Sequence, residues 1–356
     1  MGIVAIDLFC GCGGVTYGLR RAGIRVAVGV DINPDCRLTY KLNNPGAKFI
    51  ASDLRKVSER DLLTACGKVT HGEYLMLAAC APCQPFSASR RTEVSTSERT
   101  ILQQVGRLVR ELRPDFLFLE NVPGIKRVNG FSAFRRLLHT METLTYETAF
   151  KVIDAQSFGV PQTRKRLVLL ASRRVPVSWP EITHGNGSGL APLRTVRDAI
   201  REYAPLLAGE AHPTIPNHVA ASISERNMGR LRATPLNGGS RTDWPAELGL
   251  VCHETHDGHT DVYGRLKWDT PAPTLTTRCT SISNGRYGHP EQNRAISVRE
   301  AAALQSFDDN YVFYGNLKET TRQVGNSVPP IVAETFGRAF LAAVEKLELR
   351  KRKRAS

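Results

Sequence analysis

The residue with the clearest potential for chemistry is a cysteine set between two prolines, in Pro82-Cys83-Gln84-Pro85, directly after an apolar run. A thiol becomes a strong nucleophile once it is deprotonated, and nearby basic groups favour the thiolate. The Cys80-x-x-Cys83 spacing leaves two alternatives, a redox pair and a zinc site. A redox pair should open a helix, whereas Cys80 is expected to end a strand. A zinc site needs a second cysteine pair at ligand spacing, and the sequence contains none. We therefore expect Cys83 to act as a nucleophile.

A carboxylate and two guanidinium groups border two later apolar runs, in Glu120-Asn121-Val122 and Gln162-Thr-Arg164-Lys-Arg166. Open α/β sheets bind substrates where their strands end, so we expect these groups at the same edge as Cys83. Taken singly, Glu120 suits a surface acid and the two arginines suit a solvated basic edge. Together with a thiolate, they suit nucleophilic addition to a planar, electron-poor heterocycle.

A third group of residues is typical of a nucleoside site. Asp7-Leu-Phe9-Cys-Gly11-Cys-Gly13-Gly14 follows the first apolar run and opens a helix, where glycines let backbone amides approach a ligand. Thr16 stands where a dinucleotide fingerprint would carry its third glycine, which disfavours a pyrophosphate. Asp31 and Asp53 suit a ribose and an adenine amino group. The alternative is that the glycines make a tight turn and the acids cap helices.

The elements that must position these residues form a repeating pattern over the first 170 residues. Short apolar runs without clean alternation predict strands buried on both faces. Helical patterns lie between them, at Val15 to Ala22 and Ser132 to Leu144. The prediction is an α/β fold with a parallel, doubly wound sheet. The expected strands are Ile3 to Phe9, Val26 to Val30, Lys48 to Ala51, Tyr74 to Cys80, Phe116 to Leu119 and Arg166 to Ala171.

The composition changes near residue 176, where Pro, Gly, Ser and Thr become frequent and no long helical period survives. We expect a smaller, irregular domain over 177–292. Ser297-Val-Arg-Glu300 is a capping box before a helix that reaches Phe307, and Pro329-Pro330 starts a helix that packs back on the first domain. The expected divisions are a first domain over 1–176, the irregular domain over 177–292, a hinge and helix over 293–320, a return over 321–348, and a basic tail over 349–356.

These motifs, in this order, resemble the cytosine-5 DNA methyltransferases. The resemblance rests on the glycine-rich segment after Asp7, on Asp31 and Asp53, on Pro82 to Ser87, on Glu120 to Val122 and on Gln162 to Arg166. Two later segments match as well, Arg294-Ala-Ile-Ser-Val-Arg299-Glu300 and Gln323-Val-Gly-Asn326-Ser327-Val-Pro329. It covers nearly the whole chain outside 177–292, and it implies a Rossmann-like, S-adenosylmethionine-dependent methyltransferase domain with a target-recognition domain.

The family's chemistry, carried over by this resemblance, assigns Cys83 to attack carbon 6 of cytosine. Glu120 would neutralise ring nitrogen 3, Arg166 would contact the exocyclic oxygen, and Arg164 would orient the site. S-adenosylmethionine would supply the methyl group and leave as S-adenosylhomocysteine, with no metal. The cofactor-binding residues would be Phe9, Gly11, Gly13, Gly14, Asp31, Ile32, Asp53, Pro82, Asn326 and Ser327. Ile32 stands where many members carry a large aromatic residue, so we expect a different adenine packing.

The DNA partner follows from the same resemblance, since a cytosine inside a duplex must be flipped out to reach Cys83. The polar, basic segment after Ser87 would close on phosphates, with a disordered surface loop as the alternative. In 177–292, Thr274-Leu275 resembles the family's pair that precedes the base contacts. The expected DNA-contacting residues are Gln84, Ser87, Arg90, Arg91, Arg99, Arg265, Lys267, Thr274, Arg278 and Arg286.

Charge and composition agree with a nucleic-acid partner. Lys and Arg number 48 against 34 Asp and Glu, a formal net charge of +14. Residues 1–176 hold 26 basic and 15 acidic residues, whereas 177–292 hold 11 and 12. The excess therefore lies with the catalytic half and with the tail Arg350-Lys-Arg-Lys-Arg354, where we expect non-specific phosphate contacts. Without a basic leader or an apolar run long enough to span a membrane, we expect a cytoplasmic, nucleoid-associated monomer with reduced thiols.

The sequence alone is compatible with three hypotheses about the function. The first is a sequence-specific DNA cytosine-5 methyltransferase that protects host DNA beside a restriction endonuclease, which acts on the same site without direct contact. The second is an RNA (tRNA) cytosine-5 methyltransferase on the same fold. The third is a non-catalytic DNA-binding relative, which the intact Cys83, Glu120, Arg164 and Arg166 disfavour. His253-Glu-Thr-His256 lacks the spacing of a helical zinc motif and is expected to be a polar loop.

Overall fold

The computed structural model describes residues 2–67, 69–70, 72–81, 96–127, 133–249 and 261–355. The chain divides into two compact units, each of which is described by itself. Unit 1 comprises 1–155, 165–181 and 328–356, and unit 2 comprises 156–164 and 182–327. The boundaries differ from the expected divisions, because the short segment 156–164 and the whole of 293–327 belong to unit 2.

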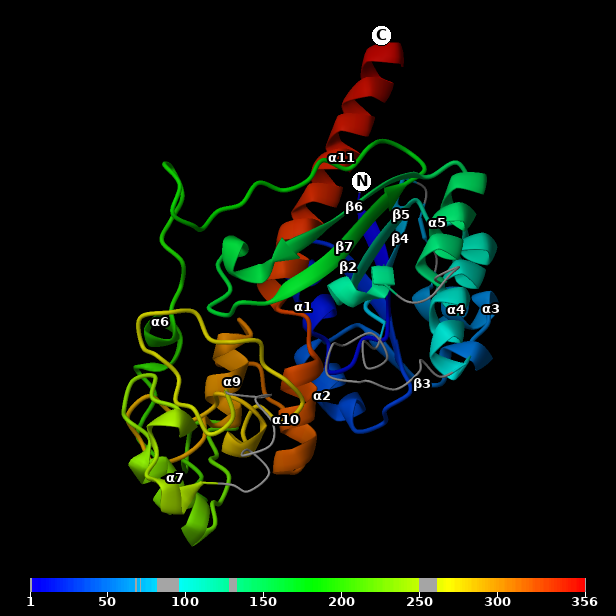
Figure 1. Cartoon of the computed structure of the whole chain (residues 1–356). Helices are drawn as coiled ribbons and strands as arrows, with labels where there is room; N and C mark the ends of the chain where they lie inside the picture. Colours follow the sequence, from blue (N-terminus) through cyan, green and yellow to red (C-terminus); the bar gives the residue numbers. More distant parts are fainter. Residues whose placement is uncertain are drawn as a thin grey trace. The chain divides into compact units, whose positions relative to one another are not determined.

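Unit 1 is built on a sheet in which the described residues form seven strands, in the order β3-β2-β1-β4-β5-β7-β6 (Figure 1). The first five strands along the chain run parallel, and β7 runs antiparallel to both of its neighbours. The strands are β1 (Ile3–Leu8), β2 (Arg25–Asp31), β3 (Lys48–Ala51), β4 (Tyr74–Ala79), β5 (Phe116–Asn121), β6 (Glu147–Asp154) and β7 (Lys165–Ser172).

The expected fold class is confirmed, with one correction. All six expected strands are present within one or two residues, but the sheet is not parallel throughout, and β6 was not expected. Its burial pattern explains the omission, because seven of its eight residues are at least partly exposed and the segment carries no apolar run. Only ten residues separate β6 from β7, which is fewer than a parallel crossover needs.

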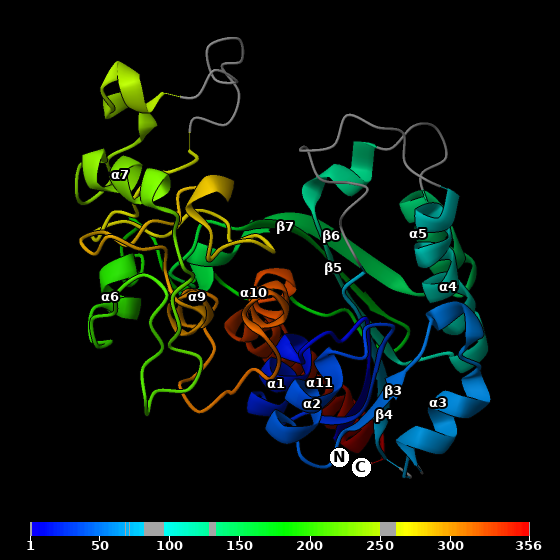
Figure 2. The same cartoon turned by 90° about the horizontal axis from the view of Figure 1, so that it is seen from below.

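The helices of unit 1 cover both faces of the sheet (Figure 2). One layer packs its apolar side against alternate strand residues such as Leu117 and Leu119. Phe116 and Phe118, which alternate with these leucines, face the opposite layer. The ring centre of Phe116 lies 5.4 Å from that of Phe340, and the ring centre of Phe118 lies 5.6 Å from that of Phe336. The first layer consists of α3 (Glu59–Cys66), α4 (Thr96–Leu112) and α5 (Ala133–Thr143), the second contains α1 (Gly14–Arg21) and α11 (Pro330–Ala355), and α2 (Cys36–Asn43) joins β2 to β3.

The helix α11 corrects the expected basic tail. Residues 349–355 do not form a separate segment, since they continue the helix that begins at Pro330. The helix packs closely on α1 because Gly18 leaves room for it: a Cβ at Gly18 would lie 2.2 Å from the carbonyl oxygen of Pro330. In the part of the chain that the structure describes, no helix is long and apolar enough to cross a membrane.

Unit 2 has little regular structure, as its Pro, Gly and Ser content predicts. The predicted capping box is confirmed: the Ser297 hydroxyl accepts from the Glu300 amide, and the Glu300 carboxylate accepts from the Ser297 amide. That carboxylate also binds both terminal nitrogens of Arg294 at 2.7 Å. The α-helices among the described residues of unit 2 are α6 (Val196–Ile200), α7 (Glu225–Ala233), α9 (Val298–Leu304) and α10 (Leu317–Asn326).

Candidate active site

A buried acid and an arginine meet where β5 ends and β7 begins. Glu120 is the second-last residue of β5 and only 3 % exposed. Its Oε1 lies 2.9 Å from Nε of Arg166, whose side chain is largely covered as well. Because β7 runs antiparallel to β5, the start of β7 comes to the edge at which β1, β4 and β5 end. This carboxyl edge therefore holds two of the four predicted catalytic residues in direct contact.

The residue after Glu120 ties this edge to the start of the cysteine segment. The buried Asn121 side-chain amide donates to the carbonyl oxygen of Ala81 at 3.1 Å. Ala81 directly precedes Pro82, so Asn121 fixes the point from which the chain leaves β4 toward Cys83. Sequence reasoning missed this role of Asn121, although the residue lies within the Glu120-Asn121-Val122 motif.

Several predicted residues lie outside the described part of the chain: Pro82, Cys83, Gln84, Ser87, Arg90 and Arg91. Arg99 lies in α4, but its side chain is not described.

The second predicted arginine, Arg164, lies in unit 2 and is buried. Its guanidinium donates to the carbonyl oxygens of Leu275 at 3.2 Å and Ser327 at 3.0 Å. Nearby, the buried Gln162 accepts from the Leu275 amide and donates to the side chain of Gln305. The Gln-Thr-Arg segment thus joins the Thr-Leu pair to the end of α10, an arrangement that holds backbone in place.

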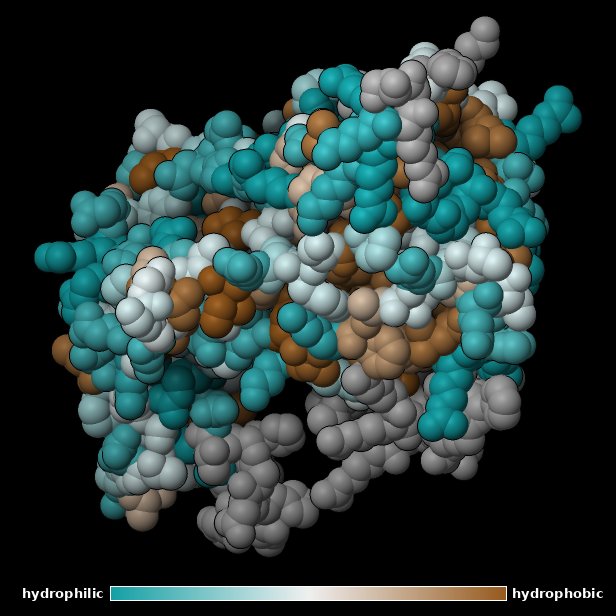
Figure 3. All heavy atoms as spheres, turned by 90° about the horizontal axis from the view of Figure 1, so that it is seen from above, coloured by the Kyte–Doolittle hydropathy of each residue, from teal (hydrophilic) through white to brown (hydrophobic). Residues whose placement is uncertain are grey.

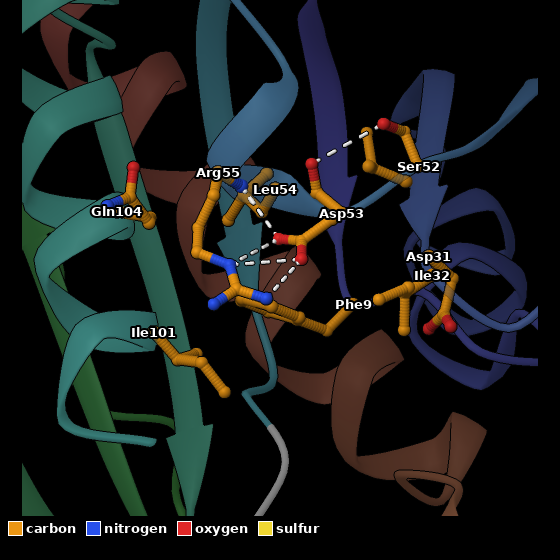
Figure 4. A pocket seen from close by; sticks show the side chains of 10 residues that line it. Phe9, Asp31, Ile32, Ser52, Asp53, Leu54, Arg55, Ile101 and Gln104 are labelled. Atoms are coloured by element: carbon orange, nitrogen blue, oxygen red, sulfur yellow. Dashed lines mark hydrogen bonds and ion pairs between the residues drawn. The ribbon is translucent and has the colours of Figure 1, made fainter. Parts of the chain in front are cut away.

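Some of the residues predicted to bind adenosine line a hollow in unit 1, at the carboxyl ends of β1, β2 and β3 (Figure 4). Phe9 lies between Asp31 and Ile32 on one side and Ile101 and Gln104 of α4 on the other. Four predicted residues therefore line one hollow. Sequence reasoning missed other lining residues because they have no motif of their own: Ser52, Leu54, Arg55, Ile101 and Gln104.

Asp31 connects this hollow to the glycine-rich turn. Its carboxylate accepts from the backbone amides of Gly11 and Asn33, both at 2.8 Å. Burial raises the pKa of Asp31, while these two amides act in the opposite direction. Phe9 takes a left-handed backbone conformation, with φ of 62°, which is costly for a bulky residue and is found at functional sites. Gly13, with φ of 101°, precedes the first turn of α1.

Beneath the turn lies a second, fully buried carboxylate. Asp7 accepts from the amide of Thr16 at 3.1 Å and from its hydroxyl at 2.7 Å, and that hydroxyl also contacts Tyr40 Oη at 3.0 Å. Burial raises the pKa of Asp7 to about 7. Thr16, which replaces the third glycine of a dinucleotide fingerprint, thus anchors α1 to β1.

Asp53 is held by its neighbour Arg55. The Arg55 Nε lies 3.0 Å from both carboxylate oxygens, and the Arg55 amide donates to Oδ1 at 2.9 Å. These hydrogen bonds lower the pKa of Asp53. Together, the aromatic ring of Phe9, the aliphatic chains of Ile32 and Ile101 and two ionisable carboxyl groups fit the apolar base and the polar hydroxyl and amino groups of an adenosine.

The predicted base-contacting residues of unit 2 differ in how far they are available. Lys267, Thr274 and Arg278 are exposed. Arg265 is fully buried, and its three nitrogens donate to carbonyl oxygens of Thr234, His289, Gln292 and Leu231 and to the Asn293 side chain. A side chain so enclosed cannot reach a base edge, so this assignment is corrected to a structural one.

Arg286 is intermediate in exposure between the exposed Lys267 and the buried Arg265. Its Nη1 donates to the carbonyl oxygens of Gly238 and Gly239 at 2.9 and 3.0 Å, and its Nε lies 3.5 Å from Asp261. It lines one hollow of unit 2 together with Lys267 and Thr274. Thr274 itself donates to the carbonyl oxygen of Thr163 at 2.7 Å, which brings the Thr-Leu pair beside the Gln-Thr-Arg segment.

The two remaining cofactor candidates lie at the end of α10 in unit 2, where Asn326 is exposed and Ser327 is buried. Gly325 before them is required sterically, because a Cβ there would lie 2.0 Å from the carbonyl oxygen of Thr276. Among the residues that the structure describes, no three His, Cys, Asp or Glu side chains gather to hold a metal ion.

Comparison with known proteins identifies the family. The model of the C-5 cytosine-specific DNA methylases matches residues 3–342. The Type II methylase M.HgiDII of Herpetosiphon aurantiacus is 37 % identical over 98 % of each chain. The Type II methyltransferase M1.HphI of Haemophilus parahaemolyticus is 33 % identical, over 96 % of this chain and 87 % of its own.

Solved structures agree on the fold. A prophage-encoded protein of E. coli, named as a DNA modification methyltransferase, superposes with a TM-score of 0.74 at 22 % identity, over 97 % of this chain and 100 % of its own. The Dnmt2 methyltransferase of S. pombe gives a TM-score of 0.63 at 16 % identity, over 98 % of this chain and 99 % of its own. The chain belongs to the C-5 cytosine-specific DNA methylases and is a DNA cytosine-5 methyltransferase.

Proposed function

We propose that this enzyme methylates one cytosine within a specific duplex sequence through a covalent adduct with Cys83. The observation that carries the proposal is the buried pair of Glu120 and Arg166 at the carboxyl edge. Asn121 beside it holds the carbonyl of Ala81, two residues before Cys83. A carboxyl group and a guanidinium fixed in a water-poor site are the groups needed to neutralise charge that develops on a cytosine ring.

Carbon 5 of cytosine is a weak nucleophile, so the base must first be activated. The Cys83 thiolate adds to carbon 6 and forms a C–S bond, and the electron pair of the 5,6 double bond makes carbon 5 nucleophilic. Glu120 protonates or hydrogen-bonds ring nitrogen 3, and Arg166 contacts the exocyclic oxygen. Once carbon 5 has taken the methyl group, it loses its proton to a base, the C–S bond breaks and the thiolate of Cys83 is restored.

S-adenosylmethionine supplies the methyl group as an electrophile when it is bound. Phe9, Ile32 and Asp31 would hold its adenosine, with the carboxylate of Asp31 toward the ribose and that of Asp53 toward the adenine amino group. Gly11, Gly13 and Gly14 bring the backbone close at the start of α1, and Pro82, Asn326 and Ser327 would border the methionine end. The apolar and acidic lining of the hollow supports this assignment.

Reaching Cys83 requires the cytosine to leave the base stack. We assign Gln84, Ser87, Arg90, Arg91 and Arg99 to the segment that closes on the DNA. In unit 2, Lys267, Thr274 and Arg278 remain candidates for contacts with the target sequence, because all three are exposed. Arg164 acts as a positioning residue through the backbone of Leu275 and Ser327.

The names of the two bacterial relatives, both Type II enzymes, support a role in restriction-modification. In that role the enzyme acts as a monomer on host DNA in the cytoplasm and protects it from an endonuclease that cuts the same sequence. No contact between the two proteins is needed, because the methyl group itself carries the information.

The test of the mechanism is to trap the adduct. A fluorine at carbon 5 cannot leave as a proton would, so DNA that carries 5-fluorocytosine at the target should stay bound to Cys83 after methyl transfer. We expect a cofactor-dependent complex that survives denaturing electrophoresis with the wild-type enzyme and is absent with Cys83→Ser. A complex that persists in Cys83→Ser would overturn the proposal, and trapping on tRNA instead of duplex DNA would favour the RNA enzyme.

A further inference from the structure

The last helix carries its positive charge to the edge of the sheet opposite the active site. Along α11, Phe336 packs on Phe118 and Phe340 on Phe116, so the helix runs against the direction of β5. Lys351, in the last part of the helix, contacts Tyr74, the first residue of β4. A six-residue strand spans about 20 Å, and the final turns of α11 extend beyond the sheet (Figure 1).

Three side chains fix the helix end in this position. The Tyr74 hydroxyl donates to Glu348, and Lys351 Nζ donates to Tyr74 Oη at 2.8 Å and to Glu348 Oε1 at 2.9 Å. The ammonium group also lies 5.3 Å from the centre of the Tyr74 ring. Lys351 and Glu348 are thereby used within the fold, whereas Arg350 and Arg352 on either side of Lys351 are exposed.

Further arginines gather at the same amino edge. Asp115 accepts from the amide of Leu75, the neighbour of Tyr74, and its other oxygen lies 2.5 Å from Nε of Arg174 and 3.3 Å from Nη2 of Arg173. Two guanidiniums thus share one buried carboxylate. Both arginines are exposed, with 44 % and 32 % of their side chains accessible. Arg113, just before β5, is exposed as well.

We propose that these residues bind the phosphate backbone of a second stretch of double-stranded DNA, distinct from the stretch at the carboxyl edge. This basic edge is defined by Arg113, Arg173, Arg174, Arg350 and Arg352. The acids inside it, Asp115 and Glu348, already hold Arg173, Arg174, Tyr74 and Lys351, so the excess charge faces outward. Glu147, which begins β6, is the exposed acid on the neighbouring strand.

DNA is the partner that the observations favour over an acidic protein. The enzyme's own substrate is a long polyanion, and exposed arginines bind phosphates without needing a shaped pocket. The face seen in Figure 3 is mostly hydrophilic, with hydrophobic side chains in separate patches, which suits a charged partner better than an apolar one. A second contact would keep the enzyme on the same molecule while its active site samples sequences, because it raises the effective concentration of DNA.

The experiment compares two variants that each lose three exposed charges from unit 1. The edge variant combines Arg113→Gln, Arg350→Gln and Arg352→Gln. The control variant combines Lys41→Gln, Arg60→Gln and Arg136→Gln, on α2, α3 and α5. The dissociation constant for DNA of several hundred base pairs without the target sequence is measured against salt concentration, and unfolding midpoints check that both variants are folded.

We expect the edge variant to bind long DNA about tenfold more weakly near 0.1 M salt, with a salt slope shallower by about 2 to 3, as three lost phosphate contacts imply. The control variant should match the wild type. Duplex DNA is stiff over about 150 base pairs, so a duplex of about 14 base pairs with the target at the active site cannot also reach the amino edge. Methyl transfer to it should stay within about twofold of wild type in both variants.

Two results would overturn the proposal. Equal weakening by edge and control variants would mean that only overall charge matters. The second result is that the edge variant binds long DNA as the wild type does, but no longer binds polyglutamate, which the wild type binds. That result would assign the surface to an acidic protein. If the wild type itself does not methylate the short duplex, that result counts against the proposed catalytic function. The proposal for the basic edge is then tested by the binding measurements alone.

Discussion

At the scale of single residues, the candidate active site is a set of ionisable groups whose neighbours decide their chemistry. Glu120 is almost wholly buried and meets the guanidinium of Arg166 at 2.9 Å. A buried carboxylate needs such a partner, because an unpaired charge out of water is costly. The same contact fixes Glu120 at the carboxyl edge, where we propose that the cytosine binds.

Glu120→Gln should reduce methyl transfer by about 10² to 10⁴, the usual contribution of a positioned acid or base. The amide keeps the shape of the side chain but can neither give a proton to ring nitrogen 3 nor pair with Arg166. Single-turnover transfer to target DNA measures the loss, and the affinity for S-adenosylmethionine should stay within about threefold. A rate within tenfold of wild type would remove Glu120 from the catalytic group.

Asp7 makes a prediction about pH. Its pKa is raised from 3.8 to about 7 in the folded protein, so the folded state holds a proton that the unfolded state releases. Its contribution to stability is full below pH 4 and is lost as the pH rises through 7. The wild type should lose on the order of 2 kcal/mol between pH 5 and 8 relative to Asp7→Asn, measured by urea unfolding without cofactor. Parallel pH profiles for the two proteins would contradict this.

At the scale of elements, the sequence predicts what local patterns determine and misses what depends on the rest of the sheet. β3 is predicted to the residue, and the capping box at Ser297 is confirmed. The prediction that β7 runs parallel to its neighbours was wrong, because the local sequence of an apolar strand does not indicate the direction of the strand beside it. Its short connection to β6 was the available signal.

The candidate site divides in the same way. Glu120, Asp31 and Asp53 could be found because they lie at or just after the ends of apolar runs, and each lies at the carboxyl edge of the sheet. Ile101 and Gln104 could not, because they reach the hollow only through the packing of α4. Arg265 was misjudged because arginine is normally exposed, and only the surrounding carbonyl oxygens reveal that it is enclosed.

The close packing of α1 on α11 gives a paired prediction from two glycines within helices. Gly18→Ala places a Cβ 2.2 Å from the carbonyl oxygen of Pro330 and should cost about 1 to 3 kcal/mol of unfolding free energy. Gly106→Ala in α4 meets its nearest atom at 3.7 Å and should be neutral or stabilising by up to about 1 kcal/mol. Urea unfolding of both variants is the measurement, and equal effects would refute the packing argument.

At the scale of the whole molecule, the basic residues are unevenly distributed along the chain. Residues 1–176 carry the excess of basic residues, whereas 177–292 is nearly neutral, which agrees with our proposal that residues of this segment contact bases rather than phosphates. The structure changes one part of this picture, because the basic residues near the C-terminus are the end of α11 and lie at the amino edge of the sheet.

Deleting residues 350–356 should therefore weaken binding to all DNA sequences by a similar factor and flatten its salt dependence, while the methylated sequence stays the same. Equilibrium binding to target and non-target DNA at several salt concentrations gives both quantities. A change in the methylated sequence would show that the helix end takes part in recognition.

The central proposal is tested most directly by bisulfite sequencing of DNA from a host that expresses the enzyme, with Cys83→Ser expressed to the same level as the control. We predict methylation at carbon 5 of one cytosine within a single recurring duplex sequence, and none with Cys83→Ser. Methylation scattered without a shared sequence, or equal methylation by the Cys83→Ser variant, would contradict the proposal.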